Sequence, residues 1–174
     1  MVETTSPAAR LEHKIRTRTA TVGVVGLGYV GLPLLRAFFQ AGFPVVGYDV
    51  DLQKIDMLKR GESYLKHLGE DFVVALAKSP KFLATTNPSD LAKADAIILC
   101  VPTPLGTHGE PDMSYIVKST EMVAKVLRKG QLISLESTTY PGTTRGDCLP
   151  ILARTGLVAG KDYFLAFSPE REDP

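Results

Sequence analysis

The segment Thr21-Val22-Gly23-Val24-Val25-Gly26-Leu27-Gly28-Tyr29-Val30-Gly31 places three glycines at GxGxxG spacing directly after a short apolar run. In a strand, loop and helix these glycines have separate tasks. Gly26 permits a tight turn, Gly28 lets a pyrophosphate approach the backbone, and Gly31 lets the helix lie close to the sheet. The helix N-terminus then faces the anion with unpaired N–H groups and the positive end of its dipole. The segment therefore predicts a phosphate-binding loop for a dinucleotide.

The residues that follow the loop support this interpretation. Apolar residues continue at helical spacing after Gly31, Gly42 supplies a helix stop, and a second strand over 45–49 ends on Asp49. A carboxylate there accepts hydrogen bonds from the adenosine ribose hydroxyls and repels a 2′-phosphate, so the pattern predicts NAD rather than NADP. Asp49 as a simple turn residue is the alternative, but the register of glycines, helix and strand favours the ribose contact.

Composition and charge exclude several classes of protein. The 174 residues are 44% hydrophobic, enough for one domain whose core needs no disulfide. Twenty basic and nineteen acidic residues give a net charge of +1, so no nucleic-acid partner is expected. Cys100 and Cys148 form no CxxC pair and the three histidines are scattered, so neither a disulfide nor a metal site is predicted. With no long apolar run and no signal-peptide core, we expect no membrane span and a cytoplasmic protein.

The chain divides into an N-terminal extension over 1–19 and one domain over 20–174. The extension is basic and has some composition typical of a transit peptide, but Leu11 and Ile15 at i, i+4 spacing favour a short helix packed on the domain. Strand and helix patterns alternate in the domain. Helices are expected over 51–59, 69–78 and 114–128 and from Thr143 or Thr144, and strands over 82–85, 96–101, 132–135 and 163–167.

This alternation predicts an α/β fold: a Rossmann-like, doubly wound parallel sheet of six or more strands with helices on both faces. In such sheets ligands bind just beyond the carboxyl ends of the strands. Three distinctive segments follow predicted strands, at 101–104, 136–144 and 168–174. Each also has an ordinary structural explanation, since prolines close strands, hydroxyls cap helices and acidic residues form solvated loops.

Taken together, these segments resemble the N-terminal domain of the UDP-glucose/GDP-mannose dehydrogenase family, the NAD-dependent nucleotide-sugar 6-dehydrogenases. The resemblance covers the chain from about residue 18 onward, in the family's order. The wording is most similar to the branch acting on UDP-N-acetylglucosamine, while UDP-N-acetylmannosamine, UDP-N-acetylgalactosamine and UDP-glucose stay open. The motifs are GVVGLGYVGLPL at 23–34, YDVD at 48–51, ILCVPTPL at 98–105, EPDMSYI at 110–116, LESTTYPGTT at 135–144 and SPEREDP at 168–174.

The resemblance implies a two-step oxidation of the sugar C6 alcohol to a carboxylate by two NAD, for surface polysaccharide precursors, with a cysteine thiolate capturing the aldehyde. It implies that Thr139 contacts the cofactor and positions water or polarises the oxyanion, and that Glu170 transfers a proton in hydrolysis. The other implied cofactor residues are Gly26, Leu27, Gly28, Tyr29, Val30 and Gly31 at the pyrophosphate, Asp49 and Lys54 at the ribose, and Val101, Pro102 and Thr103 beneath the cofactor.

The resemblance also implies that much of the family's machinery lies outside these residues. The nucleophilic cysteine, the catalytic lysine, the central helix, and the dimerisation and UDP-sugar-binding domains belong to the half that follows. This chain alone is therefore expected to bind NAD without turnover, and the UDP-sugar substrate and a homo-oligomer are expected of the full-length protein. Two other classes stay open: a stand-alone NAD(H)-binding module, and a β-hydroxyacid-type dehydrogenase, which shares the glycine loop but does not require the 135–144 and 168–172 segments.

Overall fold

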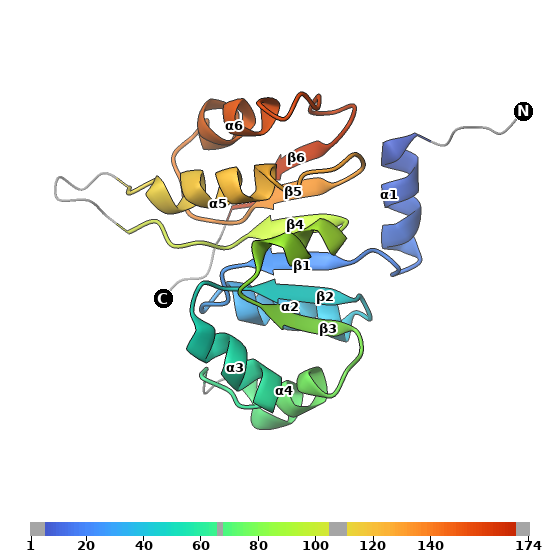
Figure 1. The fold of residues 1–174 in the computed structure, drawn as a ribbon, viewed down its shortest axis with the longest axis vertical. Coiled ribbons are helices and arrows are strands. Elements are labelled where there is room, and N and C mark those ends of the chain that lie inside the picture. The colour runs from blue at the N-terminus through green and yellow to red at the C-terminus, as the bar shows by residue number, and fades with distance from the viewer. Residues whose placement is uncertain (1–5, 66–67, 105–110, 170–174) are drawn as a thin grey trace, which may run out of the picture.

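A computed structural model describes residues 6–65, 68–104 and 111–169 of the chain. Its centre is a parallel sheet of six strands in the order β3-β2-β1-β4-β5-β6 (Figure 1). This order confirms the predicted doubly wound α/β fold. The strands are β1 (Val22–Val25), β2 (Val45–Tyr48), β3 (Phe82–Thr85), β4 (Ala96–Leu99), β5 (Leu132–Leu135) and β6 (Phe164–Phe167).

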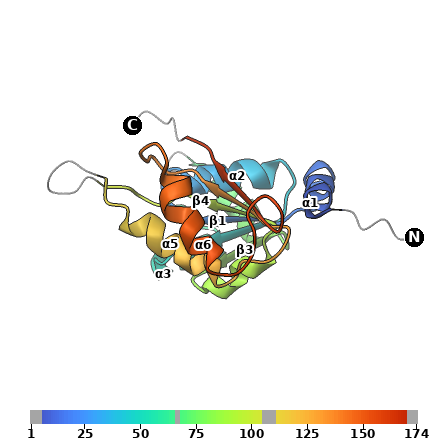
Figure 2. The same cartoon turned by 90° about the horizontal axis from the view of Figure 1, so that it is seen from above.

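Helices cover both faces of the sheet, with α2 on one side and α5 and α6 on the other (Figure 2). The 3-10 helix η2 lies between β3 and β4 in the chain, and the π-helical turn η3 leads into α6. No helix in the described part of the chain is long and apolar enough to cross a membrane. The helices are α1 (Pro7–Arg16), α2 (Gly31–Gln40), α3 (Leu52–Arg60), α4 (Glu70–Ala77), η2 (Pro88–Lys93), α5 (Ser114–Ala124), η3 (Thr144–Cys148) and α6 (Leu149–Ala153).

Two hydrophobic cores lie on opposite faces of the sheet because neighbouring strand residues point to opposite sides. In β4, Ile98 joins the core formed with α2, α3 and α4, whereas Ile97 and Leu99 join the core formed with η2, α5 and α6. Both faces are therefore covered, as in other parallel sheets, and this explains the uninterrupted apolar runs of β1 and β4. Ligand access is left to the ends of the strands.

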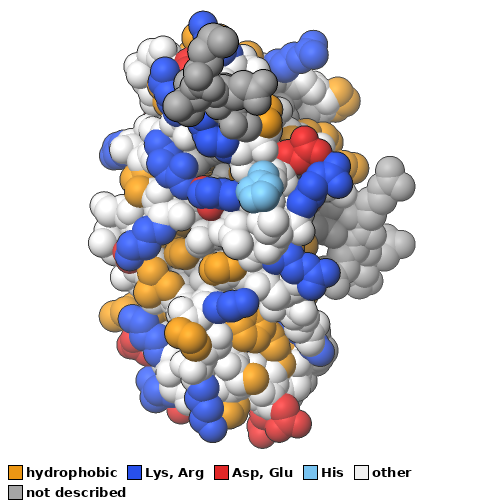
Figure 3. Space-filling view, turned by 90° about the vertical axis from the view of Figure 1, so that its right-hand side faces the viewer, with side chains coloured by type: hydrophobic (Ala, Val, Ile, Leu, Met, Phe, Trp, Pro, Cys, Tyr) orange, Lys and Arg blue, Asp and Glu red, His pale blue; other side chains and the backbone are white. Residues whose placement is uncertain are grey.

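Helix α1 occupies part of the N-terminal extension and stands at the amino ends of the strands (Figure 1). The Ser6 hydroxyl accepts a hydrogen bond from the Ala9 N–H, which caps the helix. Leu11 is buried, and Lys14 Nζ lies 2.9 Å from Asp95 Oδ1 at the start of β4. Figure 3 shows this end of the molecule, where Lys and Arg side chains are spread among smaller hydrophobic patches.

Several element ends differ from the sequence expectation for local reasons. The strand expected over 96–101 ends at Leu99: the Cys100 N–H still donates to the Val25 carbonyl, but the Val101 N–H donates to the Ser137 hydroxyl instead of a neighbouring strand. The helix expected to reach residue 128 ends at Ala124, followed by i→i−3 bonds of a tighter turn. Thr143 does not cap a helix: its hydroxyl donates to the Tyr140 carbonyl, and η3 begins at Thr144 as a π-helical turn.

Candidate functional site

A cleft of about 540 Å³ opens beyond the carboxyl ends of β1, β2, β4 and β5. It lies at the point where the strand order reverses, with β2 on one side of β1 and β4 on the other, which is where open α/β sheets bind ligands. Most of the sequence-predicted cofactor residues line it. These are Gly26, Gly28, Tyr29, Val30, Asp49, Lys54, Val101, Pro102 and Thr103.

The three loop glycines satisfy three different constraints. Gly26 has a φ of +88°, a left-handed conformation that side chains rarely adopt. A Cβ on Gly31 would overlap the Gly26 carbonyl oxygen, so α2 lies against the loop only because Gly31 has none. A Cβ on Gly28 would meet nothing within 4 Å, since this glycine borders the open cleft. Gly28 thus leaves room for a group outside the protein to reach the backbone.

The N-terminus of α2 borders the same cleft. Val30 is its N-cap residue and supplies no side-chain hydrogen bond to the first turn. Backbone N–H groups at such an end attract anions, and the helix dipole adds to the attraction. Together with the space at Gly28, this end of α2 fits a diphosphate.

Asp49 lies at the end of β2 with only 6% of its surface exposed. Its Oδ2 accepts the Leu27 N–H at 2.8 Å and lies 3.3 Å from Lys54 Nζ, and its Oδ1 accepts the Asp51 N–H at 3.0 Å. A carboxylate has about four lone-pair sites, so these three contacts leave about one acceptor position, and Asp49 lines the cleft. The buried negative charge also disfavours a 2′-phosphate at this place.

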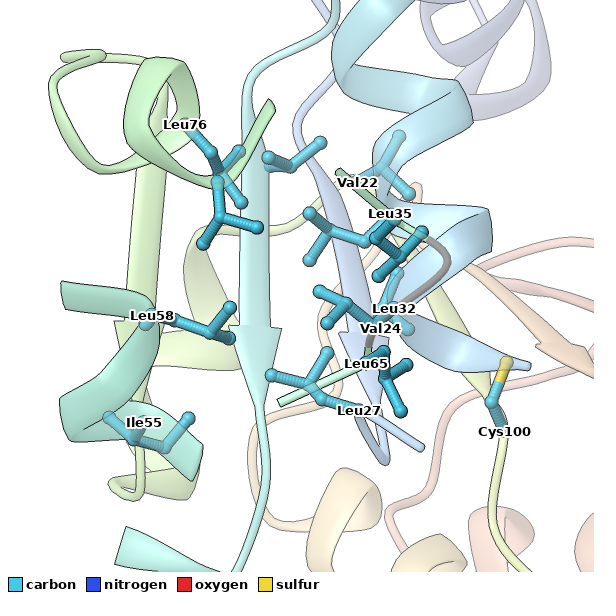
Figure 4. Packing of buried hydrophobic residues seen from close by; sticks show 14 of the residues in the cluster. Val22, Val24, Leu27, Leu32, Leu35, Ile55, Leu58, Leu65, Leu76 and Cys100 are labelled. Atoms are coloured by element: carbon cyan, nitrogen blue, oxygen red, sulfur yellow. The ribbon is translucent and has the colours of Figure 1, made fainter. Parts of the chain in front are cut away.

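Leu27 belongs to the hydrophobic core and does not line the cleft. Its side chain is fully buried and lies beside Leu65 in the core on the α2 face (Figure 4). Gly31 is likewise buried and outside the cleft lining. These two residues of the predicted pyrophosphate loop are buried and support the loop backbone through their packing.

Ser137 connects the loops that follow β4 and β5, and both loops line the cleft. Its hydroxyl accepts the Val101 N–H at 3.1 Å and lies 2.8 Å from the Val101 carbonyl. Thr103 Oγ1 donates to the Thr138 carbonyl at 2.7 Å. These bonds hold 101–103 and 136–138 together as one wall.

Two cleft residues, Tyr115 and Ser119 on α5, were not expected to lie at the site. Glu136 and Thr138 also line the cleft; they belong to the strand-end segment 136–144, although neither was named as a site residue. The apolar periodicity of the segment predicts which side of α5 is buried, but it does not identify residues that line a cleft. Thr139 is half-buried and outside the cleft lining, and Glu170 lies outside the described residues.

The two cysteines lie in different surroundings: Cys100 lines the cleft, whereas Cys148 lies in the core formed with η2, α5 and α6. Cys100 and Cys148 are both buried thiols that form no disulfide in the described part of the chain. Burial raises the pKa of Cys148, and the Thr120 hydroxyl 3.6 Å from its sulfur opposes this only in part. A thiol kept protonated in an apolar core is unreactive, so Cys148 is structural.

The sheet order, the glycine loop, the helix N-terminus and the carboxylate at the strand switch point define a dinucleotide-binding domain. The chain belongs to the UDP-glucose/GDP-mannose dehydrogenase family: the family's NAD binding domain matches residues 20–174. This confirms the resemblance read from the motifs and identifies NAD as the cofactor of the domain.

Named relatives are similar to the chain over most of its length. A UDP-N-acetyl-D-glucosamine 6-dehydrogenase of Pseudomonas aeruginosa is 42% identical over 155 residues, 88% of this chain and 36% of the relative. A UDP-N-acetyl-D-mannosamine dehydrogenase of Pyrococcus horikoshii is 36% identical, over 88% of this chain and 37% of the relative. The solved structure of an NDP-N-acetyl-D-galactosaminuronic acid dehydrogenase from Methanosarcina mazei Go1 matches with a TM-score of 0.83 and 37% identity, over 97% of this chain and 38% of that one. The chain thus spans well under half the length of the relatives it matches.

Proposed function

We propose that the whole protein oxidises the C6 alcohol of a UDP-N-acetylhexosamine, with UDP-N-acetylglucosamine as preferred substrate, and that this chain binds the NAD. The observation that carries the proposal is the cleft at the strand switch point, where Gly28 is open to a diphosphate and Asp49 keeps one acceptor position. Relatives that act on UDP-N-acetylglucosamine and on UDP-N-acetylmannosamine support the substrate class, and their identities to this chain overlap. The choice of glucosamine rests on the wording of the sequence motifs.

In this proposal the residues of the chain bind the NAD and orient it. Bound NAD supplies the hydride acceptor. The glycine loop and the start of α2 would hold the diphosphate, while Asp49 and Lys54 would hold the adenosine ribose. The wall formed by 101–103 and 136–138 would border the nicotinamide half of bound NAD and shield it from water on one side. Thr139 and Glu170 are proposed to position the hydrolytic water and to transfer its proton.

Assay of the full-length gene product tests the activity. UDP-N-acetylglucosamine, UDP-N-acetylmannosamine and UDP-glucose are each supplied with excess NAD, and NADH is counted per sugar consumed. We expect two NADH per sugar, fastest with UDP-N-acetylglucosamine. One NADH per sugar would contradict the two-step oxidation, and a faster rate with another sugar would reassign the substrate.

Activity of the full-length product, together with NADH titration of this chain, separates two other classes. A stand-alone binding module would bind NADH, yet the full-length product would oxidise no UDP-sugar. A β-hydroxyacid-type enzyme would oxidise a hydroxy acid instead. A diketoreductase structure matches with a TM-score of 0.58 at 15% identity, so that similarity shows the fold alone. We further propose that the full-length protein is cytoplasmic and homo-oligomeric and makes a precursor of surface polysaccharide.

A further inference from the structure

We propose that Tyr64 is a positioning residue for dinucleotide binding: its hydroxyl holds the Leu27–Gly28 peptide so that the Gly28 N–H faces the cleft. The inference rests on the proposed NAD binding and assigns a task to a residue outside the glycine motif. Tyr64 lies after α3, 37 residues beyond Leu27 in the chain, and its hydroxyl donates to the Leu27 carbonyl at 2.7 Å.

The side chain, the N–H and the carbonyl of Leu27 are each fixed by a contact outside the loop. Its side chain is buried in the core, its N–H donates to Asp49 Oδ2 at 2.8 Å, and its carbonyl accepts from Tyr64. The acceptor and the donor come from different segments, β2 and the stretch after α3. The residue that precedes the open glycine therefore has one orientation, set from outside the loop.

Peptide planarity transmits this orientation to Gly28. The Leu27 carbonyl and the Gly28 N–H belong to one trans peptide unit, so they point in opposite directions. Fixing the oxygen toward Tyr64, beneath the loop, fixes the N–H toward the other side. Gly28 has no side chain and nothing lies within 4 Å of a would-be Cβ, although its own carbonyl accepts the Leu32 N–H at 3.1 Å. That bond acts on the peptide after Gly28. On the Leu27–Gly28 peptide, the Tyr64 hydroxyl is the group that holds the carbonyl.

Tyr64 is in turn tied to the groups at the ribose site. Lys54 Nζ lies 5.9 Å from the centre of the Tyr64 ring and 3.3 Å from Asp49 Oδ2. Burial raises the pKa of Tyr64, and the nearby carboxylates of Asp49 and Asp51 raise it further, so the hydroxyl remains a donor throughout the neutral range. The same few side chains thus serve the ribose position and the diphosphate position.

The test is Tyr64→Phe, which keeps the ring beside Lys54 and removes only the donor. We expect NADH and ADP-ribose to bind about 3- to 10-fold more weakly, because one hydrogen bond that orients the peptide is lost. Adenosine, which has no diphosphate, should bind as it does to the unaltered chain. Affinities are measured well below the melting temperature of both proteins, by NADH fluorescence and by amide NMR shifts.

The matched control is Tyr163→Phe on the opposite face of the sheet. The Tyr163 hydroxyl is buried and has no hydrogen-bond partner among the described residues, so its removal should leave NADH affinity unchanged. Equal affinities of Tyr64→Phe and the unaltered chain would overturn the inference, as would a parallel loss of adenosine binding. An unaltered chain that binds no NADH would instead overturn the proposed function.

A measurement on the unaltered chain covers the case in which Tyr64→Phe does not fold. The Gly28 amide resonance should shift on addition of ADP-ribose and stay in place on addition of adenosine. If the Gly28 resonance is unmoved while other cleft amides shift with ADP-ribose, its N–H does not face the diphosphate and the inference fails.

Discussion

An added methyl group has different consequences at two glycines of the loop. At Gly31 it meets the backbone oxygen of Gly26, an atom that cannot move without reshaping the turn. At Gly28 it enters the open cleft. The two glycines are identical in the motif, but Gly31 is required by the packing of α2, whereas Gly28 leaves open space at the cleft.

We predict that Gly28→Val abolishes NADH binding while the melting temperature stays close to that of the unaltered chain. The valine fills space that a diphosphate needs and touches little of the protein. Fluorescence titration and differential scanning fluorimetry measure the two quantities. Gly31→Val is the comparison: it should lower the free energy of unfolding by about 1–3 kcal/mol or more through overpacking. Retained NADH binding in Gly28→Val would contradict the site.

Asp49→Ala is expected to weaken NADH binding by about 1–3 kcal/mol, because a charged acceptor for the ribose is lost. It should also reduce stability, since the N–H groups of Leu27 and Asp51 lose their acceptor. Asp49→Asn keeps an acceptor and separates the two effects. Removal of the negative charge should narrow the gap between NADH and NADPH affinities, and an unchanged ratio in calorimetric titrations would argue against the ribose assignment.

Residue types in sequence revealed part of this site. Glycine spacing and a carboxylate after the second strand pointed to the loop and to Asp49, because those positions depend on local backbone geometry. Tyr64, Tyr115 and Ser119 gave no such signal. Each reaches the site through the packing of an element distant in the chain, which no local pattern encodes.

Among the elements, α1 is attached to the sheet at the end opposite the cleft. Its attachment combines the buried Leu11 with the ion pair between Lys14 and Asp95. Arg128, just beyond α5, donates to the same carboxylate at 2.9 Å. Asp95 therefore connects the N-terminal extension to the start of β4 and to the region after α5.

Removal of residues 1–16 should lower the melting temperature by about 4–8 °C, since one buried leucine and its contacts are lost. NADH affinity should stay within about twofold, because α1 contributes no residue to the cleft. The two quantities come from thermal scans and NADH titration of the shortened chain. A large loss of affinity would show that α1 is coupled to the site.

The carboxyl group of Asp95 should make the stability of the fold depend on pH. Burial opposes ionisation of its carboxyl, but hydrogen bonds from Lys14, Arg128 and the Thr21 N–H outweigh burial and lower its pKa. A lowered folded-state pKa stabilises the fold above the unfolded-state value of about 4, and this stabilisation is lost as the pH falls through the lowered value. Asp95→Asn should therefore be less stable than the unaltered chain at pH 7, with the difference shrinking toward pH 3. Urea unfolding at both pH values measures it, and a constant difference would contradict this account.

Element types were more predictable than element ends. The apolar run at 96–101 predicted a strand covered on both faces, and all four residues of β4 are buried. Cys100 still donates its N–H to the Val25 carbonyl of β1, but the N–H of Val101 is bonded to a serine 36 positions further on. The 3-10 helix η2 was not anticipated, since Pro88–Lys93 offers too short a pattern to be separated from a loop.

For the whole molecule, dinucleotide binding should appear as thermal stabilisation. A ligand at about 100 times its Kd adds about 2.7 kcal/mol to a fold that binds it only when native. For a domain of this size the melting temperature should rise by about 5–10 °C. Thermal scans across a series of NADH concentrations measure the rise, with Gly28→Val showing none. Absence of any rise at millimolar NADH would count against the assignment of the cleft.

The position of α1 has a practical consequence. This helix stands at the amino ends of the strands, so a biotin or sensor surface coupled to it would leave the mouth of the cavity turned toward the flowing solution. Immobilised in this way, the protein could report metabolite levels without the support blocking entry.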